Sequence, residues 1–135
     1  MSRKKQKGAN SKAVRLTSTE LEMMQIIWRH DSCTVATVRQ ELLPERDLAY
    51  TSVSTIVRIL EKKGFVTSTR EGRGYVYSAS IEKKEYQEQA LNFLVCDVFD
   101  RTPTLLVQRL VDSDVLTKEE LQEFQDLLRS KAPGR

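Results

Sequence analysis

Residues 49–63, which read AYTSVSTIVRILEKK, constrain the fold more than any other stretch of this chain. Four apolar residues in it recur at the i, i+3, i+4 and i+7 spacing, so they form one stripe along a helix that must be buried. These residues are Val53, Ile56, Val57 and Leu60. The opposite face carries hydroxyls near the helix start and cations farther along, the side chains that reach base edges and phosphates in a major groove. They are Thr51, Thr55, Arg58 and Lys62.

A capping sequence predicts that another helix begins near Thr17. Thr17 and Glu20 have the spacing of a capping box, and Leu16 can pack on Leu21 across the helix boundary as a hydrophobic staple. The helix is expected to run to about His30, which we interpret as a C-terminal cap or surface residue. Its buried face is expected to contain Leu21, Met24, Ile27 and Trp28, widened by Met23 and Ile26. An apolar arc this wide indicates a central core helix.

A shorter helix and a turn connect this core helix to residues 49–63. Residues 36–43 predict the shorter helix, and Pro44 ends it because proline cannot continue a helix. Residues 44–47 form a polar turn, and Gly64 is expected to end the next helix in a left-handed conformation. Two helices separated by a turn form the helix-turn-helix arrangement. A polar outer face is common to all amphipathic helices, so this context is what favours a DNA-recognition helix.

A β-hairpin is expected directly after the recognition helix. The β-prone residues 65–70 and 75–78 flank a glycine-containing turn at residues 71–74. Arg70 and Arg73 lie near the tip, where a wing can contact phosphates or the adjacent minor groove. Hairpin tips are commonly polar for other reasons, but a hairpin that follows such a helix favours DNA contact. The expected unit is a winged helix-turn-helix.

Four segments of the chain resemble the penicillinase-repressor family, which also includes the methicillin-resistance and copper-responsive repressors. They read LTSTELEMMQIIW, CTVATVRQEL, LAYTSVSTIVRILEKKGFV and GRGYVYSA, and the resemblance covers about residues 16–130. It implies a homodimeric repressor that binds a dyad-symmetric operator in double-stranded DNA, with genes of the β-lactam-resistance type as targets. It also implies DNA contacts by Thr51, Ser52, Ser54, Thr55 and Arg58. With the cations noted above, the predicted DNA-binding residues are Thr51, Ser52, Ser54, Thr55, Arg58, Lys62, Arg70 and Arg73.

Residues 82–100 predict a helix with apolar side chains on nearly every face. Such a helix is buried all round, and so short a chain has too little left to cover it, so we expect a second copy to supply the cover. Two shorter helices follow, one opened by Pro103 and one by a second capping box at Thr117 and Glu120. The expected dimer interface consists of Leu91, Phe93, Leu94, Val98, Leu106, Leu110, Phe124 and Leu128.

Charge is distributed unevenly along the chain. Residues 1–15 contain six cations and no acid, whereas the remaining residues contain 16 basic and 19 acidic side chains. The basic arm is expected to be disordered, and it either adds sequence-independent affinity for phosphates or serves only as a solubilising leader. From residue 81 onward the net charge is −3, which phosphates would repel, so this part fits a dimerisation role away from the DNA.

These observations predict a mainly α fold with a small β-hairpin wing. The expected divisions are a basic arm (1–15), a winged helix-turn-helix DNA-binding domain (16–80), an all-α, three-helix dimerisation domain (81–130) and a tail (131–135). No apolar run approaches the roughly 20 residues that span a bilayer, so we expect no membrane insertion and a cytoplasmic location. The main alternative function is a winged helix used as a protein-interaction module that docks a different protein.

Motifs for catalysis or metal binding are not evident in the sequence. It has no glycine-rich phosphate loop and no serine or cysteine with a histidine partner in view, so we expect a binding protein, not an enzyme, with no cofactor. Cys33 and Cys96 lack the spacing of zinc ligands and are interpreted as small core residues. Copper-responsive members of the family end in a cysteine cluster. No cysteine follows Cys96 here, so metal sensing by that route is not expected.

The resemblance also implies a route of induction. In the penicillinase and methicillin-resistance repressors, a membrane sensor protease triggers cleavage of an Asn-Phe bond in the helix after the long dimer helix, and the repressor is released. Alignment on the second capping box places Arg109 and Leu110 at that bond. The Asn-Phe pair is absent here, so a sensor-linked protease would have to recognise a different bond within residues 105–115.

Overall fold

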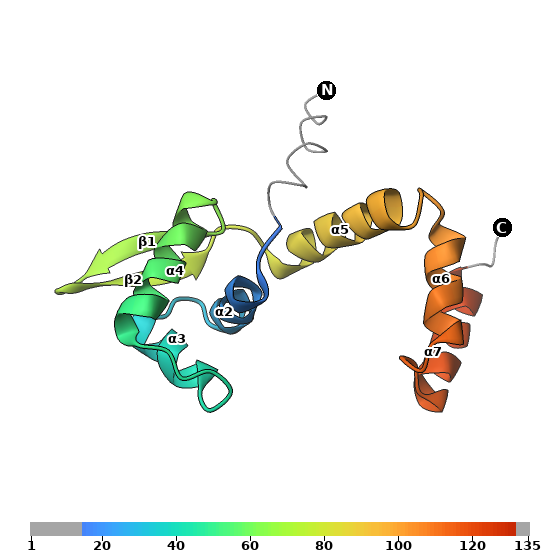
Figure 1. Ribbon diagram of the computed structural model, residues 1–135, viewed down its shortest axis with the longest axis horizontal. Helices are drawn as coiled ribbons and strands as arrows, with labels where there is room; N and C mark the ends of the chain where they lie inside the picture. Colours follow the sequence, from blue (N-terminus) through green and yellow to red (C-terminus); the bar gives the residue numbers. More distant parts are fainter. Residues whose placement is uncertain (1–14, 132–135) are drawn as a thin grey trace, which may run out of the picture. The chain divides into compact units, whose positions relative to one another are not determined.

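The computed structural model describes residues 15–131 of the chain (Figure 1). Residues 1–14 of the predicted basic arm and residues 132–135 of the predicted tail lie outside the described part. The described elements are, in order, α2 (Ser18–Arg29), α3 (Val35–Leu42), α4 (Tyr50–Lys62), β1 (Val66–Glu71), β2 (Gly74–Ala79), α5 (Lys83–Phe93), the π-helical turn η1 (Leu94–Val98), α6 (Pro103–Asp112) and α7 (Lys118–Lys131). The predicted fold class, mainly helical with one antiparallel β-hairpin, is confirmed.

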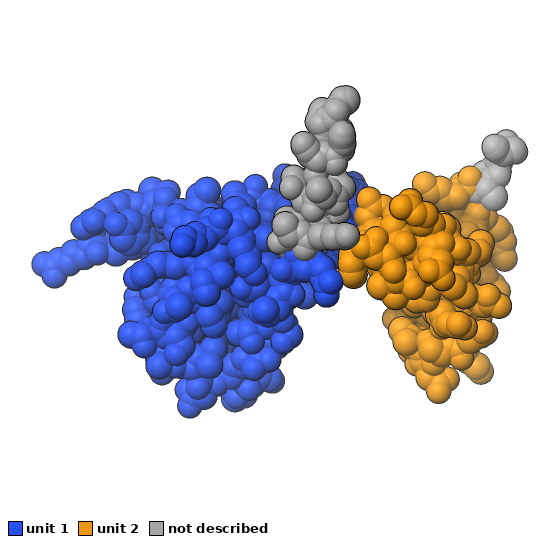
Figure 2. Space-filling view, turned by 45° about the horizontal axis from the view of Figure 1, so that its top comes forward, with its two compact units in different colours: residues 1–90 blue, residues 91–135 orange. Residues whose placement is uncertain are grey.

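The chain divides into two compact units, residues 1–90 and residues 91–135 (Figure 2). The boundary falls inside α5, so the first part of that helix belongs to the first unit. The expected division into a DNA-binding domain that ends at residue 80 and a dimerisation domain that begins at residue 81 stays a prediction.

Helix α2 lies at the centre of the first unit's core. Met23, Met24 and Ile27 are fully buried, because α3, α4 and β2 all contact this helix. The predicted core helix with a wide apolar arc is therefore confirmed. Leu21 and Trp28 are buried less than expected, because Leu21 lies in the first turn and Trp28 lies at the edge of the core.

The predicted helix caps are present. Thr17 Oγ1 accepts from the Glu20 N–H at 3.1 Å and Glu20 Oε1 accepts from the Thr17 N–H at 2.9 Å, so the capping box of α2 is complete. Thr117 and Glu120 repeat the same two bonds, at 3.1 and 2.9 Å, before α7. Helix α2 ends at His30, whose N–H donates to a carbonyl oxygen of the preceding turn at 3.1 Å. Each cap uses residues three or four positions apart, which is why the sequence revealed them.

Strands β1 and β2 form a hairpin with a tight turn. Glu71 pairs with Gly74, so both strands reach one residue closer to the turn than predicted and leave two residues for it, while β1 begins at Val66, one residue later than predicted. Gly72 has a φ of 62° in this turn, a backbone conformation that glycine adopts without steric cost. Cys33 forms an isolated bridge with Tyr77 and is buried, as predicted. Burial raises the pKa of the Cys33 thiol.

The helix expected over residues 82–100 changes pitch before it ends. Helix α5 continues into η1, in which the Phe99 N–H donates to the Leu94 oxygen five residues earlier, at 2.9 Å. Asp100 and Arg101 then adopt left-handed backbone angles, with φ of 53° and 60°, and the helix stops. The helical part ends at Val98, slightly before the predicted bound, and its change of pitch was not predicted, because apolar content does not reveal a change of hydrogen-bonding pattern.

Candidate nucleic-acid interface

The outer face of α4 is the surface on which most of the predicted DNA contacts lie. Val53, Val57 and Leu60 are fully buried and Ile56 packs against them partly buried, so the predicted apolar stripe is confirmed. Ser54, one of the predicted contact residues, is partly buried. The other predicted contact residues of this helix are exposed, and they are Thr51, Ser52, Thr55, Arg58 and Lys62. Helix α4 therefore presents hydroxyls and cations outward, whereas their contact with DNA stays a prediction.

Thr55 already uses its hydroxyl hydrogen inside the helix. Its Oγ1 donates to the backbone oxygen of Thr51, one turn earlier, at 2.9 Å. The hydroxyl can still accept a hydrogen bond, and the methyl group can pack against a thymine methyl. Arg58, three residues farther on, carries guanidinium donors that suit the acceptors of guanine. Acceptor and donor roles are thus divided between two neighbouring side chains of one helix face.

Two exposed apolar side chains of α4 were not predicted. Tyr50 is 54% exposed in the first turn, and Ile59 is 39% exposed. Ile59 lines an open hollow together with Thr55, Arg58, Glu61 and Lys62. Apolar side chains in a major groove can contact thymine methyl groups. Because Ile59 falls outside the apolar stripe, the sequence could have indicated that its side chain is exposed.

Two arginines hold the turn before α4. Arg39 Nε donates to the Leu48 oxygen at 2.7 Å, and Arg46 forms an ion pair with Glu22 of α2 through its Nε and, at 3.2 Å, its Nη2. The Arg46 guanidinium holds the pKa of Glu22 below its ordinary value. Ala49, the N-cap of α4, has no side-chain cap, so these contacts take over the positioning of the helix start. Neither contact was predicted, because the partners lie 9 and 24 residues apart.

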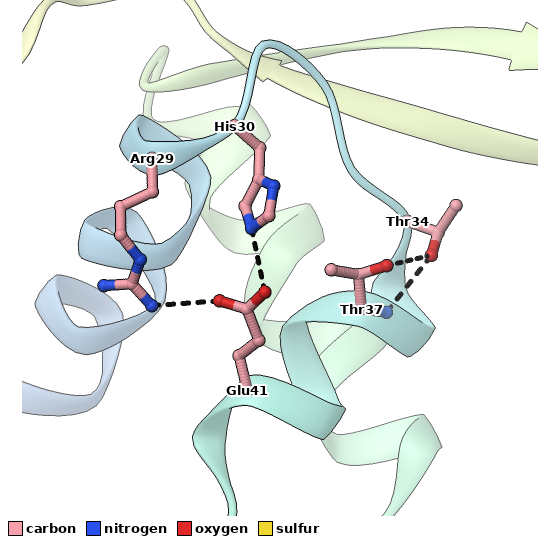
Figure 3. A network of polar contacts seen from close by, with 5 residues as sticks. All are labelled: Arg29, His30, Thr34, Thr37 and Glu41. Atoms are coloured by element: carbon pink, nitrogen blue, oxygen red, sulfur yellow. Dashed lines mark hydrogen bonds and ion pairs between the residues drawn. The ribbon is translucent and has the colours of Figure 1, made fainter.

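A polar network joins the end of α2 to α3 (Figure 3). Glu41 lies between Arg29 Nη2 and His30 Nε2, with one carboxylate oxygen 2.9 Å from each. The hydrogen bond from Arg29 is the largest of the effects that lower the pKa of Glu41, and His30 adds to it. Thr34 caps α3 by accepting from the Thr37 N–H at 3.1 Å. The network holds α2 and α3 together, and His30 is part of a helix end, as predicted.

The end of α4 is tied both to α2 and to the wing. Gly64 has a φ of 87°, the left-handed conformation predicted for this helix end. Lys63 Nζ lies 2.9 Å from Glu20 Oε1, and Ser68 Oγ of β1 donates to Glu61 Oε2 at 2.8 Å. Burial opposes ionisation of Glu20, but the hydrogen bonds from Lys63 and from the capping box outweigh it, so the pKa of Glu20 lies below its ordinary value. Helix α4 is thus anchored at its C-terminal end.

The wing holds its two predicted arginines differently. Arg70 lies opposite Tyr75 in the strand register, with its guanidinium carbon 5.4 Å from the ring centroid and its Nη1 3.4 Å from the hydroxyl. Stacking of this kind restricts the guanidinium without neutralising it. Arg73 lies in the exposed turn at the tip. Tyr75 is 47% exposed and was not predicted as part of this surface.

The predicted dimer-interface residues lie in a unit whose described side chains include none that is buried. Leu91, Val98 and Leu128 are 52–54% exposed. The other predicted interface residues are partly buried, and they are Phe93, Leu94, Leu106, Leu110 and Phe124. Four apolar residues outside the predicted interface are also exposed, namely Val107, Val111, Val115 and Leu127. Exposed apolar side chains this numerous are typical of a surface that another chain covers.

The predicted cleavage position lies within a helix. Arg109 and Leu110 belong to α6, where Arg109 is exposed and Leu110 is partly buried. Beyond the end of α6, Val115 is 64% exposed. Within residues 105–115, the residues after α6 are therefore more accessible than those inside the helix.

Within residues 15–131, no group of three or more His, Cys, Asp and Glu side chains is arranged to hold a metal ion. Cys96 is only partly buried, less than expected for a core residue, because its unit has no described buried side chain. None of the helices in the described part is long and apolar enough to cross a membrane.

Sequence comparisons match this chain to transcriptional regulators along most of its length. A family model described as "Penicillinase repressor" matches residues 16–130. A penicillinase repressor from Bacillus licheniformis is 28% identical over 117 residues, which cover 87% of this chain and 91% of that protein. The methicillin resistance regulatory protein MecI from Mammaliicoccus sciuri is 23% identical over 122 residues, which cover 90% of this chain and 99% of that protein.

A comparison with solved structures supports the fold. A mutant of MarR from E. coli, complexed with operator DNA, matches with a TM-score of 0.52 and 15% sequence identity. The match covers 91% of this chain and 80% of that chain. At this level of identity the match shows a shared fold.

Proposed function

The chain belongs to the penicillinase repressor family, and from this premise we propose that it represses transcription by binding a dyad-symmetric DNA operator as a homodimer. The observation that carries the proposal is the exposed row of hydroxyls and cations on α4, which is followed by a wing and lies opposite an apolar stripe whose Val53, Val57 and Leu60 are fully buried. A helix built this way can enter a major groove while its other face stays in the core. A repressor of this kind acts on the chromosome, so the cytoplasm is its proposed location.

The contacts divide into base recognition and phosphate binding. Thr51, Ser52, Ser54, Thr55 and Arg58 are the proposed base-reading residues, because the N-terminal part of a recognition helix approaches the base edges. Lys62 lies in the last turn and is proposed to bind phosphate. Arg70 and Arg73 are proposed to contact the DNA backbone or the adjacent minor groove from the wing.

Dimerisation is proposed to occur through the second unit. A unit of 45 residues without one buried described side chain cannot be stable on its own apolar contacts. A second copy would cover the exposed Leu91, Val98 and Leu128 and bring two recognition helices to two half-sites. The negative net charge from residue 81 onward disfavours DNA as the cover.

Relief of repression is proposed to follow a cut within residues 105–115 by a sensor-linked protease. Arg109 and Leu110 lie inside α6, so a cut between them requires local opening of that helix. The exposed residues after α6, around Val115, need no such opening. Either cut separates α7 from the rest of the chain and weakens the dimer. Mass spectrometry of the chain from cells exposed to a β-lactam should reveal a fragment that ends in this segment, and an intact chain on derepressed promoters would contradict this route.

The proposed function is tested by selecting the DNA sequences that the chain binds and by measuring how many chains bind each duplex. The full-length chain should enrich sequences with two-fold symmetry from a random pool of double-stranded DNA. Sedimentation with a selected duplex should then show two chains per duplex. Enrichment of sites without symmetry, or one chain per duplex, would contradict the dimer. No enrichment at all would contradict sequence-specific binding and would favour a protein as the partner of the exposed apolar residues.

A further inference from the structure

Three aromatic side chains from separate parts of the first unit meet at the start of α5. The ring centroid of Tyr86 lies 5.8 Å from that of Trp28, with the ring planes at 42°. It also lies 5.8 Å from that of Phe65, in an edge-to-face arrangement at 72°. These distances and angles are those of favourable aromatic pairs. We refer to Trp28, Phe65 and Tyr86 as the aromatic clasp.

The aromatic clasp joins α5 to elements that position the recognition helix. Trp28 lies in the last turn of α2, and Phe65 is 1% exposed and directly follows Gly64, where the recognition helix ends. Trp28 Nε1 also donates to the backbone oxygen of Ile81 at 2.9 Å, so it holds the segment that leads into α5. Helix α5 is therefore attached close to the C-terminal end of α4, the helix that is proposed to read DNA.

Few other side chains of α5 can make this attachment. Within residues 83–90, which belong to the first unit, Tyr86 and Gln89 are partly buried and the other residues are exposed. They lie three residues apart, so they occupy the same side of the helix. The rest of this stretch consists mostly of Lys, Glu and Gln, and a helix of 11 residues is marginally stable alone in water. The direction of α5 as it leaves the first unit thus depends on the aromatic clasp.

We propose that the aromatic clasp selects the spacing between operator half-sites that the homodimer accepts. The inference rests on the proposed function, because half-site spacing has meaning only for a dimer on a dyad-symmetric operator. A helix whose exit direction is fixed lets the two DNA-binding units reach half-sites at one separation. A helix that pivots at its start lets them reach several separations, each with a lower effective concentration. Tyr86 is then a positioning residue that determines specificity without contacting DNA.

The test uses the full-length chain and duplexes derived from the selected operator. The centre-to-centre distance between the half-sites is changed by one base pair at a time, and affinity is measured for each duplex. The wild type should bind one spacing best and lose about tenfold or more in affinity when one or two base pairs are added. Tyr86→Ala should flatten this profile, while affinity for a single half-site and the sedimenting dimer stay unchanged. Tyr86→Phe keeps the ring and should retain the wild-type profile.

Two results would overturn the inference. One is a Tyr86→Ala profile as sharp as that of the wild type, and the other is a wild-type profile without an optimum. Failure of the proposed function looks different, because the wild type would then select no dyad-symmetric site at all.

Amide hydrogen exchange distinguishes a variant that fails to fold from one that folds but no longer fixes the direction of α5. Tyr86→Ala should speed exchange in residues 86–93 and leave exchange in α2 and α4 unchanged. If Tyr86→Ala does not fold, Tyr86→Leu takes its place, because it removes the ring contacts with Trp28 and Phe65 and keeps an apolar side chain. A folded Tyr86→Leu chain must then show the flattened spacing profile. A profile as sharp as that of the wild type would overturn the inference.

Discussion

Lys63 Nζ donates to both carboxylate oxygens of Glu20, at 2.9 and 3.0 Å. Glu20 completes the capping box at the start of α2, and Lys63 is the C-terminal cap of α4. One carboxylate therefore caps the core helix and holds the end of the helix that is proposed to face DNA. At 6% exposure, Glu20 is the only charged side chain that is buried among residues 15–131.

Glu20→Ala should destabilise the first unit by about 2 kcal/mol, because it removes a capping acceptor and leaves the Lys63 ammonium without its partner. Urea unfolding followed by the fluorescence of Trp28, the single tryptophan of the chain, reports on this unit. The matched control is Glu120→Ala, which breaks the equivalent capping box at the exposed start of α7. It should shift the same transition by less than about 0.5 kcal/mol. Equal shifts would contradict the special role of the Lys63 pair.

The stabilisation from Glu20 should depend on pH in one direction. The pKa of Glu20 in the folded chain lies below its ordinary value of 4.5, so the stabilisation is complete above that value and is lost as the pH falls through the folded-state pKa. The free energy of unfolding should therefore differ between the wild type and Glu20→Gln by a constant amount down to about pH 5, and by less below it. Urea titrations at several pH values measure this difference. A difference that grows in acid would contradict the sign of the shift.

Arg73→Ala should lower the affinity for all duplexes alike. A lost phosphate contact at the wing tip releases fewer counterions, so the slope of log K against log salt concentration should shrink by about one. Arg129→Ala is the control, because this side chain is 72% exposed on α7, in the other unit. It should leave the slope unchanged. If Arg73→Ala also left the slope unchanged, the wing tip would not contact phosphate.

Leu91→Asp should separate the protomers. Leu91 is 52% exposed, so a charge there disturbs little packing within one chain but would be buried in the apolar interface of the dimer. Sedimentation should show a monomer, and affinity for the complete operator should fall by about 10²-fold or more while half-site affinity stays constant. Asn92→Asp adds a charge at the neighbouring exposed position and should leave the dimer intact. A folded Leu91→Asp chain that sediments as a dimer would exclude Leu91 from the interface core.

Features encoded within one helical turn or one hairpin were predictable. The capping boxes of α2 and α7, the buried stripe of α4 and the left-handed end at Gly64 follow from residue types at fixed short spacings. The wing was predictable as well, because two β-prone runs flank glycines. These elements carry most of the predicted DNA-contacting residues, so the candidate surface could be drawn from the sequence.

Features that depend on distant partners could not be predicted in this way. Glu20 and Lys63 lie 43 residues apart, and Trp28 and Ile81 lie 53 residues apart. Nothing in the local pattern of Arg39 distinguishes an arginine that holds Leu48 from one that is free in solvent. Tertiary contacts of this kind decide how the recognition helix is held, and they become visible only in the folded chain.

The central claim is that the exposed face of α4 reads base sequence, and Arg58→Ala tests it most directly. Affinities of the wild type and of Arg58→Ala are measured for the selected operator and for an unrelated duplex at one salt concentration. A bidentate arginine contact is worth about 1 to 3 kcal/mol of discrimination. In Arg58→Ala, the free-energy difference between specific and nonspecific binding should therefore shrink by that amount, and the ratio of the two affinities should fall accordingly. Lys62→Ala, which removes a proposed phosphate contact on the same face, should lower both affinities and preserve the ratio. A ratio unchanged in Arg58→Ala would contradict the assignment of this face to base recognition.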